Sequence, residues 1–177
     1  MIKGIKNNKG FTLIELLAVI VILGILMIVA IPQVTKYIEQ AKRDTFADTA
    51  RAYINSARYM YLNDELNSEG CTLGVNAKIP LNQIDMESNK DKSTFGGNIV
   101  GYVLINAIPE KDTENNKTGN YSYEYYIAAQ DDKKLWGIAE TKETLVKGKK
   151  VTKLNKNEIE NLKQIICNDE VQPKLQK

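Results

Sequence analysis

An uninterrupted apolar run near the amino terminus constrains this chain more than any other feature. The run, FTLIELLAVIVILGILMIVAI, extends from Phe11 to Ile31 and contains only two polar residues, Thr12 and Glu15. As an α-helix with a rise of 1.5 Å per residue, about 21 residues span roughly 31 Å, which is about the hydrocarbon thickness of a bilayer. The run therefore predicts one transmembrane helix.

The residues before the run predict its orientation. Lys3, Lys6 and Lys9 precede it, and residues 1–10 contain no acidic side chain. A basic flank followed by an apolar run places the amino terminus inside and the rest of the chain outside. A cleaved secretory signal peptide has the same charge order, but this run is longer than a usual apolar signal core and no A-x-A-like site follows it.

Composition excludes most familiar enzyme chemistry. The 177 residues include no His and only two Cys, with 24 Lys+Arg against 22 Asp+Glu. Without His there is no His-based general base, no Ser-His-Asp or Cys-His nucleophile and no His ligand for zinc. Two Cys far apart make neither a four-thiolate metal site nor a C-x-x-C redox pair. A net charge of +2 is too small to indicate a nucleic-acid binder.

Glu15 is the anomaly within the apolar run. A carboxylate in a transmembrane helix costs on the order of 2–4 kcal/mol on insertion scales, so it is usually paired and functional. Glu15 also lies only one turn into the run. A location near the lipid headgroups, where the cost is small, is therefore the alternative explanation.

The residues around Glu15 resemble a known motif. Lys9-Gly10-Phe11-Thr12-Leu13-Ile14-Glu15 is similar to the cleavage and methylation motif of type IV prepilins, G|F-T-x-x-E followed by a continuous apolar helix. The resemblance is close up to about Thr35 and looser along the rest of the helix. Four features match the motif together: a leader that ends in Lys-Gly, a Phe directly after it, a Glu five places into the mature chain and a Pro further along the helix.

This resemblance implies how the chain is processed and assembled. In the family, a membrane-embedded peptidase cuts after the Gly and methylates the new amino terminus, which correspond here to Gly10 and Phe11. Gly10 suits an extended, tightly enclosed backbone because it has no side chain to clash. The resemblance also implies that Glu15 pairs with the amino terminus of a neighbouring subunit, since opposite charges in a low-dielectric filament core are tolerated mainly when paired.

Past the apolar run the pattern becomes amphipathic without a break. Apolar residues recur at three- to five-residue spacing, the pattern fades at Asn63-Asp64-Glu65, and Gly70 is a stop signal. We therefore predict one helix from about Phe11 to about Leu66, with its second half packed against a head domain. The recurring residues are Val34, Ile38, Ala41, Phe46, Ala50, Tyr53, Ala57 and Tyr61.

Two residues are expected to be breakpoints in this helix. Pro32 removes one backbone hydrogen bond and displaces the carbonyl of Ile28, which predicts a kink or a local opening. Gly24 weakens the helix one to two turns earlier. Both residues are common in ordinary transmembrane helices. The resemblance implies more, because the stretch between the matching Gly and Pro melts in assembled pili and lets filaments extend.

The head domain reads as a small antiparallel sheet. Residues 71–98 indicate an irregular connecting loop with one helical turn near Leu81–Met86. Tyr121, Tyr123, Tyr125 and Ile127 alternate with a period of two, and turn residues at 131–132 and 147–148 favour hairpins. The predicted strands are Ile99–Ile108, Tyr121–Ala129, Lys134–Glu140 and Leu145–Leu154.

A short carboxy-terminal helix is expected after these strands. Asn155 and Glu158 have the spacing of a capping box. The inward residues of this helix would be Ile159, Leu162, Ile165 and Ile166. Together, the predicted helices and strands indicate an α+β fold. In this fold a long kinked amino-terminal helix packs against a small antiparallel sheet, as the resemblance to type IV pilins also implies.

Cys71 begins the head and Cys167 nearly ends it. In an exported domain, two Cys so placed favour a disulfide, and two reduced thiols in an anaerobic setting are the alternative. Many family members bracket only a carboxy-terminal segment with their two Cys, so a family connectivity is not carried over to this chain.

A local basic stretch in the head has two interpretations. A solvated hairpin is the simpler one, since Glu140, Glu143 and Glu158 dilute the charge. The other is contact with DNA, because some pilin relatives serve in DNA uptake and Tyr125 and Trp136 are near in sequence. The lysines are Lys142, Lys147, Lys149, Lys150, Lys153 and Lys156. Asn116-Lys117-Thr118 and Asn120-Tyr121-Ser122 match the glycosylation sequon, which arises often by chance.

We interpret the chain as a type IV pilin, a structural filament subunit and not an enzyme, with no cofactor and no metal. The expected parts are a cytoplasmic leader at 1–10, a transmembrane and filament-core helix at 11–34, an amphipathic half-helix at 35–69 and a globular head at 70–177. The chain would be a single-pass membrane protein before assembly and part of an extracellular pilus afterwards.

The resemblance also implies the partners and the roles. The partners are further copies of the chain, a prepilin peptidase/methyltransferase, an inner-membrane assembly platform and minor pilins, with DNA left open. Adhesion, aggregation and twitching motility follow only from family analogy. A pseudopilin of a type II secretion or competence machine shares every amino-terminal feature and is the first alternative. A membrane-tethered binding or enzymatic ectodomain is the second.

Overall fold

The structure of the chain is a computed structural model. It describes residues 10–66, 69–86, 92–111, 117–156, 158–160 and 162–174, so the predicted leader, apart from Gly10, lies outside the described residues. The chain divides into two compact units, residues 1–39 and 40–177. Each unit is described by itself.

The long helix α1 extends from Leu13 to Leu62. It begins after Thr12, which caps its first turn, and ends before Asp64, whose backbone has a φ of 58° and leaves the helical region. The predicted loss of helical pattern at residues 63–65 is therefore confirmed. α1 continues through Gly24 and Pro32 as one α-helix, and their role as breakpoints in an assembled filament stays a prediction. Only one backbone hydrogen bond depends on the missing N–H, and the turns on either side keep theirs.

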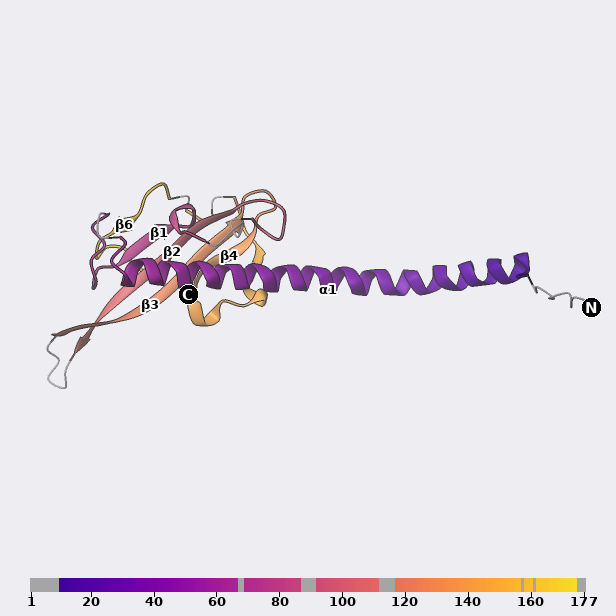
Figure 1. Cartoon of the computed structure of the whole chain (residues 1–177), viewed down its shortest axis with the longest axis horizontal. Coiled ribbons are helices and arrows are strands. Elements are labelled where there is room, and N and C mark those ends of the chain that lie inside the picture. The colour runs from indigo at the N-terminus through magenta and orange to yellow at the C-terminus, as the bar shows by residue number, and fades with distance from the viewer. Residues whose placement is uncertain are drawn as a thin grey trace, which may run out of the picture. The chain divides into compact units, whose positions relative to one another are not determined.

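Within the described residues, six antiparallel strands form one sheet. Their order across the sheet is β5-β4-β3-β2-β1-β6, and Figure 1 shows β1 to β4 beside the second half of α1. The predicted antiparallel hairpins β2–β3 and β3–β4 are confirmed. The strands are β1 (Ala77–Pro80), β2 (Ile99–Lys111), β3 (Lys117–Asp131), β4 (Trp136–Lys142), β5 (Thr152–Lys153) and β6 (Ile166–Cys167).

The main core lies between one face of the sheet and the second half of α1. Buried residues of α1 recur every three or four positions, as the stripe of an amphipathic helix requires. Val103 and Ile105 of β2 and Ile127 and Ala129 of β3 face them at a period of two. Val34, Ile38 and Ala41 belong to the predicted apolar stripe but are exposed. The buried α1 residues are Phe46, Ala47, Ala50, Tyr53, Ile54, Ala57 and Tyr61.

The opposite face of the sheet is covered by the carboxy-terminal segment. Tyr102, Leu104 and Ala128 alternate with the residues of the main core and pack against Leu154 and Ile159. Both faces of the central strands are therefore buried, which explains why β2 is apolar at almost every position from Ile99 to Ile105.

The predicted carboxy-terminal helix is wrong. The capping contact does form, with the Asn155 N–H donating to Glu158 Oε2 at 2.9 Å. No helix follows among the described residues of 155–166. Ile159 packs on the outer face of the sheet, whereas Ile165 packs on the main core and Ile166 pairs with Lys78 of β1. One helix face cannot point to both sides of a sheet, and the described residues of this segment form turns and bends instead.

Two other segments differ from expectation. The loop predicted at 71–98 contains the strand β1, which is only four residues long and ends at Pro80; the helical turn predicted inside this loop is confirmed as η2 (Leu81–Gln83). The strand predicted at Leu145–Leu154 is instead two 3₁₀ turns, η3 (Glu143–Leu145) and η4 (Gly148–Lys150), followed by β5. Val146 and Val151 are buried five positions apart, a spacing that alternating strand geometry does not produce.

Candidate functional site

Gly10 and Phe11 lie in non-helical chain just before α1. The side chain of Phe11 is 92% exposed, and a Cβ on Gly10 would meet nothing within 4 Å. The fold of this chain therefore does not itself require glycine at position 10. A requirement for glycine there would come from a partner that encloses the backbone closely.

Thr12 and Glu15 form a reciprocal cap on the first turn of α1. The Thr12 N–H and the Thr12 hydroxyl both donate to Glu15 Oε2, each at 2.8 Å. In return, the Glu15 N–H donates to Thr12 Oγ1 at 3.3 Å. This is a capping box, which satisfies helix N–H groups that have no partner in the helix and places a carboxylate at its positive end.

The capping box gives Thr12 a role that the resemblance to the prepilin motif did not assign to it. The motif points to its Gly, Phe and Glu, although the T-x-x-E spacing is itself the sequence signature of a capping box. Glu15 therefore has a partner within its own chain before any second subunit is present. A substitution at Glu15 removes both the helix cap and the charge, and an experiment must separate the two effects.

The first half of α1 presents apolar side chains on all sides. Every large hydrophobic residue from Leu13 to Ile31 is 47–83% exposed. The helix is long and apolar enough to cross a membrane. Around Gly24 a Cβ would meet nothing within 4 Å, so this chain's own packing does not require glycine there either.

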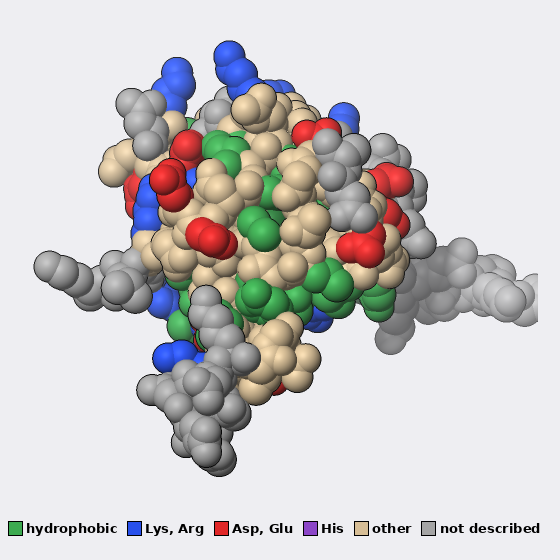
Figure 2. Space-filling model, turned by 90° about the vertical axis from the view of Figure 1, so that its left-hand side faces the viewer, with side chains coloured by type: hydrophobic (Ala, Val, Ile, Leu, Met, Phe, Trp, Pro, Cys, Tyr) green, Lys and Arg blue, Asp and Glu red, His purple; other side chains and the backbone are tan. Residues whose placement is uncertain are grey.

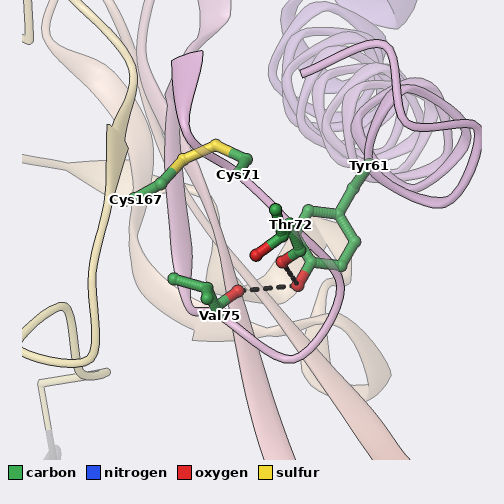
Figure 3. The surroundings of a disulfide bond; sticks show 5 residues. All are labelled: Tyr61, Cys71, Thr72, Val75 and Cys167. Carbon is green, nitrogen blue, oxygen red and sulfur yellow. Dashed lines mark hydrogen bonds between the residues drawn. A yellow bond between two sulfur atoms is a disulfide. The ribbon is translucent and has the colours of Figure 1, made fainter. Parts of the chain in front are cut away.

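Cys71 and Cys167 form a disulfide with a Cα–Cα distance of 5.1 Å. The bond joins the loop after α1 to β6, and Figure 3 shows Tyr61 of α1 below it. The buried Tyr61 hydroxyl donates to the carbonyl oxygens of Val75 at 2.6 Å and Thr72 at 3.1 Å. Helix, loop and sheet edge are thus joined at one place in the head.

The basic stretch of the head does not gather around accessible aromatic rings. Tyr125 is 8% exposed and lies under the Arg58 guanidinium, 4.3 Å from the ring centre. Trp136 stacks on Phe95 with ring centroids 5.3 Å apart and is covered by Arg43. Figure 2, which views the head from the end where α1 finishes, shows no continuous group of basic side chains on that face. Both aromatic residues are therefore engaged in packing.

The sequon that begins at Asn120 lies on β3. Asn120 is exposed on β3, while Asn116 lies outside the described residues.

Comparisons with known proteins bear on the amino-terminal segment and on about two thirds of the chain. A family model described as "Prokaryotic N-terminal methylation motif" matches residues 5–31, which include Gly10, Phe11, Glu15 and Gly24. The type IV major fimbrial protein FimA of Dichelobacter nodosus is 31% identical over 120 residues, which are 64% of this chain and 71% of that protein. No solved structure matches the chain significantly.

Proposed function

The chain belongs to the type IV pilin family, and we propose that it is cut after Gly10, methylated on Phe11 and assembled through α1 into a surface pilus. In this proposal a prepilin peptidase/methyltransferase performs the processing, and an inner-membrane platform and minor pilins serve the assembly. The pilus would support adhesion, aggregation or twitching motility. The similarity to a major fimbrial protein favours a major pilin over a pseudopilin.

The observation that carries the proposal is the arrangement of residues 10–15. The proposed cut lies in exposed, non-helical chain, which a peptidase can bind in an extended form. The cut creates an ammonium group on Phe11, and methylation leaves it charged. In each subunit this cation would then lie four residues before Glu15, in the non-helical chain that leads into α1.

Charge pairing gives this arrangement its selectivity during assembly. Apolar helices that leave lipid for a filament core change little in hydrophobic exposure, so packing and polar contacts decide which subunits associate. A buried carboxylate without a partner is costly, whereas one beside an ammonium group is tolerated. We propose that Glu15 meets the methylated terminus of a neighbouring subunit and thereby sets the axial register of the filament.

Glu15→Gln tests this proposal more sharply than Glu15→Ala. Glutamine retains the acceptor of the capping box but removes the charge. We expect normal membrane insertion and cleavage, a methylated Phe11 and no filaments. Thr12→Ala is the matched control, because it removes the hydroxyl of the capping box and keeps the Glu15 charge, and it should still assemble. Normal filaments from Glu15→Gln would overturn the charge-pairing role.

Sequencing the amino terminus of sheared surface filaments tests the processing. Methylated Phe11 in abundant long filaments is the expected result. Methylated Phe11 found only in membranes would select a pseudopilin, and an intact Met1 would contradict both assignments.

A further inference from the structure

Exposed lysines gather at the end of the head at which α1 enters it. Residues 40–177 form one compact unit, and its first part is the α1 segment from Gln40 to Arg51. The lysines lie on this segment and on the turns before and after β4. We call them the basic end: Lys42, Lys133, Lys134, Lys147, Lys149 and Lys150, all of them exposed.

The turn after β4 lies directly against α1. Gly148 approaches the helix so closely that a Cβ there would overlap the carboxylate of Asp44. Arg51 donates from its Nε to the carbonyl oxygen of Val146 at 3.1 Å. These contacts hold residues 147–150, with three of the lysines, beside the first part of the head helix.

The turn before β4 reaches the same place through the loop that precedes β2. In this loop the Thr94 hydroxyl donates to the carbonyl oxygen of Lys42 at 3.0 Å. Three residues later the Gly97 N–H donates to Asp131 at 2.8 Å, and Asp131 also accepts the N–H of Lys133 at 3.0 Å. Lys133 and Lys134 are therefore joined to the start of the head helix by a chain of hydrogen bonds.

Acidic side chains at this end are fewer than the lysines and are engaged locally. Asp48 forms a salt bridge with Arg51, and Asp44 accepts a hydrogen bond from Gln40. Asp131 is fully buried, and the carboxylate at position 132 accepts the N–H of residue 98 at 2.8 Å. Among the described residues, none of the lysines of the basic end forms a salt bridge.

The opposite end of the head is acidic. Figure 2 views this end, where α1 finishes, and shows acidic side chains spread over it. From Lys42 to Leu62 the helix rises by roughly 30 Å, which is about three Debye lengths at physiological salt. A charged surface that attracts one end therefore acts only weakly on the other. The exposed acidic residues here include Asp64, Glu65, Glu69, Asp169 and Glu170.

We propose that the basic end binds the anionic phospholipid headgroups of the membrane from which α1 emerges. This proposal rests on the membrane insertion that is part of the proposed function. Clusters of lysine beside a transmembrane helix are attracted to anionic lipid surfaces, and the attraction grows with each lysine that comes near the surface. The acidic end would be repelled by the same surface, so the head would be held in one orientation until assembly removes it.

The length of helix after the apolar run brings the basic end within reach of the headgroups. Lys42 follows Ile31 by 11 residues of α1, which amounts to at most roughly 16 Å. Headgroups extend roughly 5–8 Å beyond the hydrocarbon core, and charges attract over a Debye length of about 8–10 Å. Together with the length of a lysine side chain, these distances cover the gap.

The acidic end of a second copy is also complementary in charge to the basic end. The lipid surface is favoured because α1 tethers it to the basic end of every inserted chain. A tethered contact needs no encounter and has a high effective concentration, whereas a second copy has to approach with the correct end.

Quenching by lipid headgroups tests the contact in the full chain. The native cysteines are joined in a disulfide, so Thr152→Cys, exposed on β5, carries a single fluorophore near the basic end. The chain is placed in vesicles that contain a lipid with a nitroxide headgroup, with phosphatidylcholine alone or mixed with phosphatidylglycerol. We expect more quenching with phosphatidylglycerol, and loss of this increase at about 1 M salt, where the Debye length is about 3 Å. Equal quenching in the two kinds of vesicle would overturn the proposal.

Charge reversal separates the basic end from net charge. Lys149→Glu with Lys150→Glu changes the basic end, and Lys111→Glu with Lys174→Glu makes the same change in net charge at exposed positions elsewhere. We expect the first pair to remove the increase in quenching and the second pair to keep it. Equal losses from the two pairs would contradict a specific role of the basic end.

Two further outcomes would also overturn the lipid contact, for different reasons. Quenching that follows the number of chains per vesicle and not the lipid charge would assign the basic end to a second copy. A chain that alkaline carbonate extracts from the vesicles would contradict membrane insertion, and with it the proposed function. An inserted chain whose quenching ignores lipid charge contradicts the lipid contact alone, because the measurement requires neither cleavage nor filaments.

Discussion

The hydroxyl oxygen of Tyr61, in the last turn of α1, lies 2.6 Å from the carbonyl oxygen of Val75, two residues before β1. This contact and the neighbouring one to Thr72 join the end of the helix to the loop that holds Cys71 (Figure 3). Tyr61 is fully buried. Burial, together with the adjacent Tyr123 phenol, raises the pKa of Tyr61 to about 12.

Tyr61→Phe is expected to lower the free energy of unfolding by about 1–2 kcal/mol at neutral pH, because two buried carbonyls lose their donor. The raised pKa favours the neutral phenol in the folded chain, so this stabilisation is complete below pH 10 and is lost as the pH rises towards 12. Chemical denaturation of the full chain in detergent should show the gap between parent and variant narrowing over that interval. Tyr59→Phe changes a residue that is 67% exposed. It should leave the free energy of unfolding unchanged both at neutral pH and near pH 12.

Asp131 is expected to be the most sensitive carboxylate of the head. It is fully buried and accepts hydrogen bonds from the N–H groups of Gly97 at 2.8 Å, Lys133 at 3.0 Å and Lys134 at 2.5 Å. Burial alone would raise the pKa of Asp131, but these bonds outweigh it and hold the pKa below its usual value of 3.8. Asp131→Asn should destabilise the chain by about 3 kcal/mol. The carboxylate has two acceptor oxygens, whereas the amide has one, so the NH₂ group of Asn would face one of the three N–H donors.

The same residue sets a pH dependence. Since the pKa of Asp131 is lower in the folded chain, its contribution is present above pH 3.8 and is lost as the pH falls through the folded value. Denaturation midpoints measured from pH 6 down to pH 2 should fall less steeply for Asp131→Asn than for the parent. Asp132→Asn is the control at the adjacent, exposed position; an equally large loss there would contradict the special role of Asp131.

Removing the disulfide should cost about 4 kcal/mol of unfolding free energy, because the bond closes a loop with a sequence separation of 96 residues. Cys71→Ala with Cys167→Ala is the variant, and thermal unfolding with and without reductant is the measurement. Reductant should destabilise the parent by the same amount and leave the variant unchanged. Hydrogen exchange should increase at β1, since Ala77 and Lys78 pair with β6. A parent that is insensitive to reductant would contradict this prediction.

Gly101→Ala is expected to destabilise the head by more than about 2 kcal/mol. Gly101 has a φ of +141°, and a Cβ there would overlap the carbonyl oxygen of Ala128 on the paired strand. Gly96→Ala is the matched comparison, because Gly96 has a φ of +99° but open space around it. Gly96→Ala should therefore lose less stability than Gly101→Ala, because only backbone strain opposes the added Cβ. Similar losses at the two positions would show that the close approach of β3 does not matter.

Sequence patterns predicted the helix and the central hairpins because both are local. The apolar run and the spacing of Phe46, Ala50, Tyr53 and Ala57 need only the period of an α-helix, and the alternation of Tyr121 to Ile127 needs only the period of a strand. The amino-terminal motif likewise indicated Gly10, Phe11 and Glu15, since all three lie within six consecutive residues. The T-x-x-E spacing at Thr12 is just as local and is the signal that indicates the helix cap.

The parts that sequence alone did not predict are those in which distant segments compete for one surface. Ile159 and Ile165 have helical spacing, yet they belong to opposite faces of the sheet. β1 and β6 are too short to show a period, and each exists because it pairs with a neighbour far away in the chain.

By itself, the sequence determined the long apolar helix, its charged residue and the family of the chain, since each depends on residues close together. Only the tertiary structure decided which short strands exist and which face of the sheet each carboxy-terminal residue covers. That arrangement depends on β1 pairing with both β2 and β6, and on Ile159 and Ile165 packing on opposite faces of the sheet. Contacts of this kind join residues separated by tens of positions in the sequence. The periodicity of neighbouring residues does not predict them.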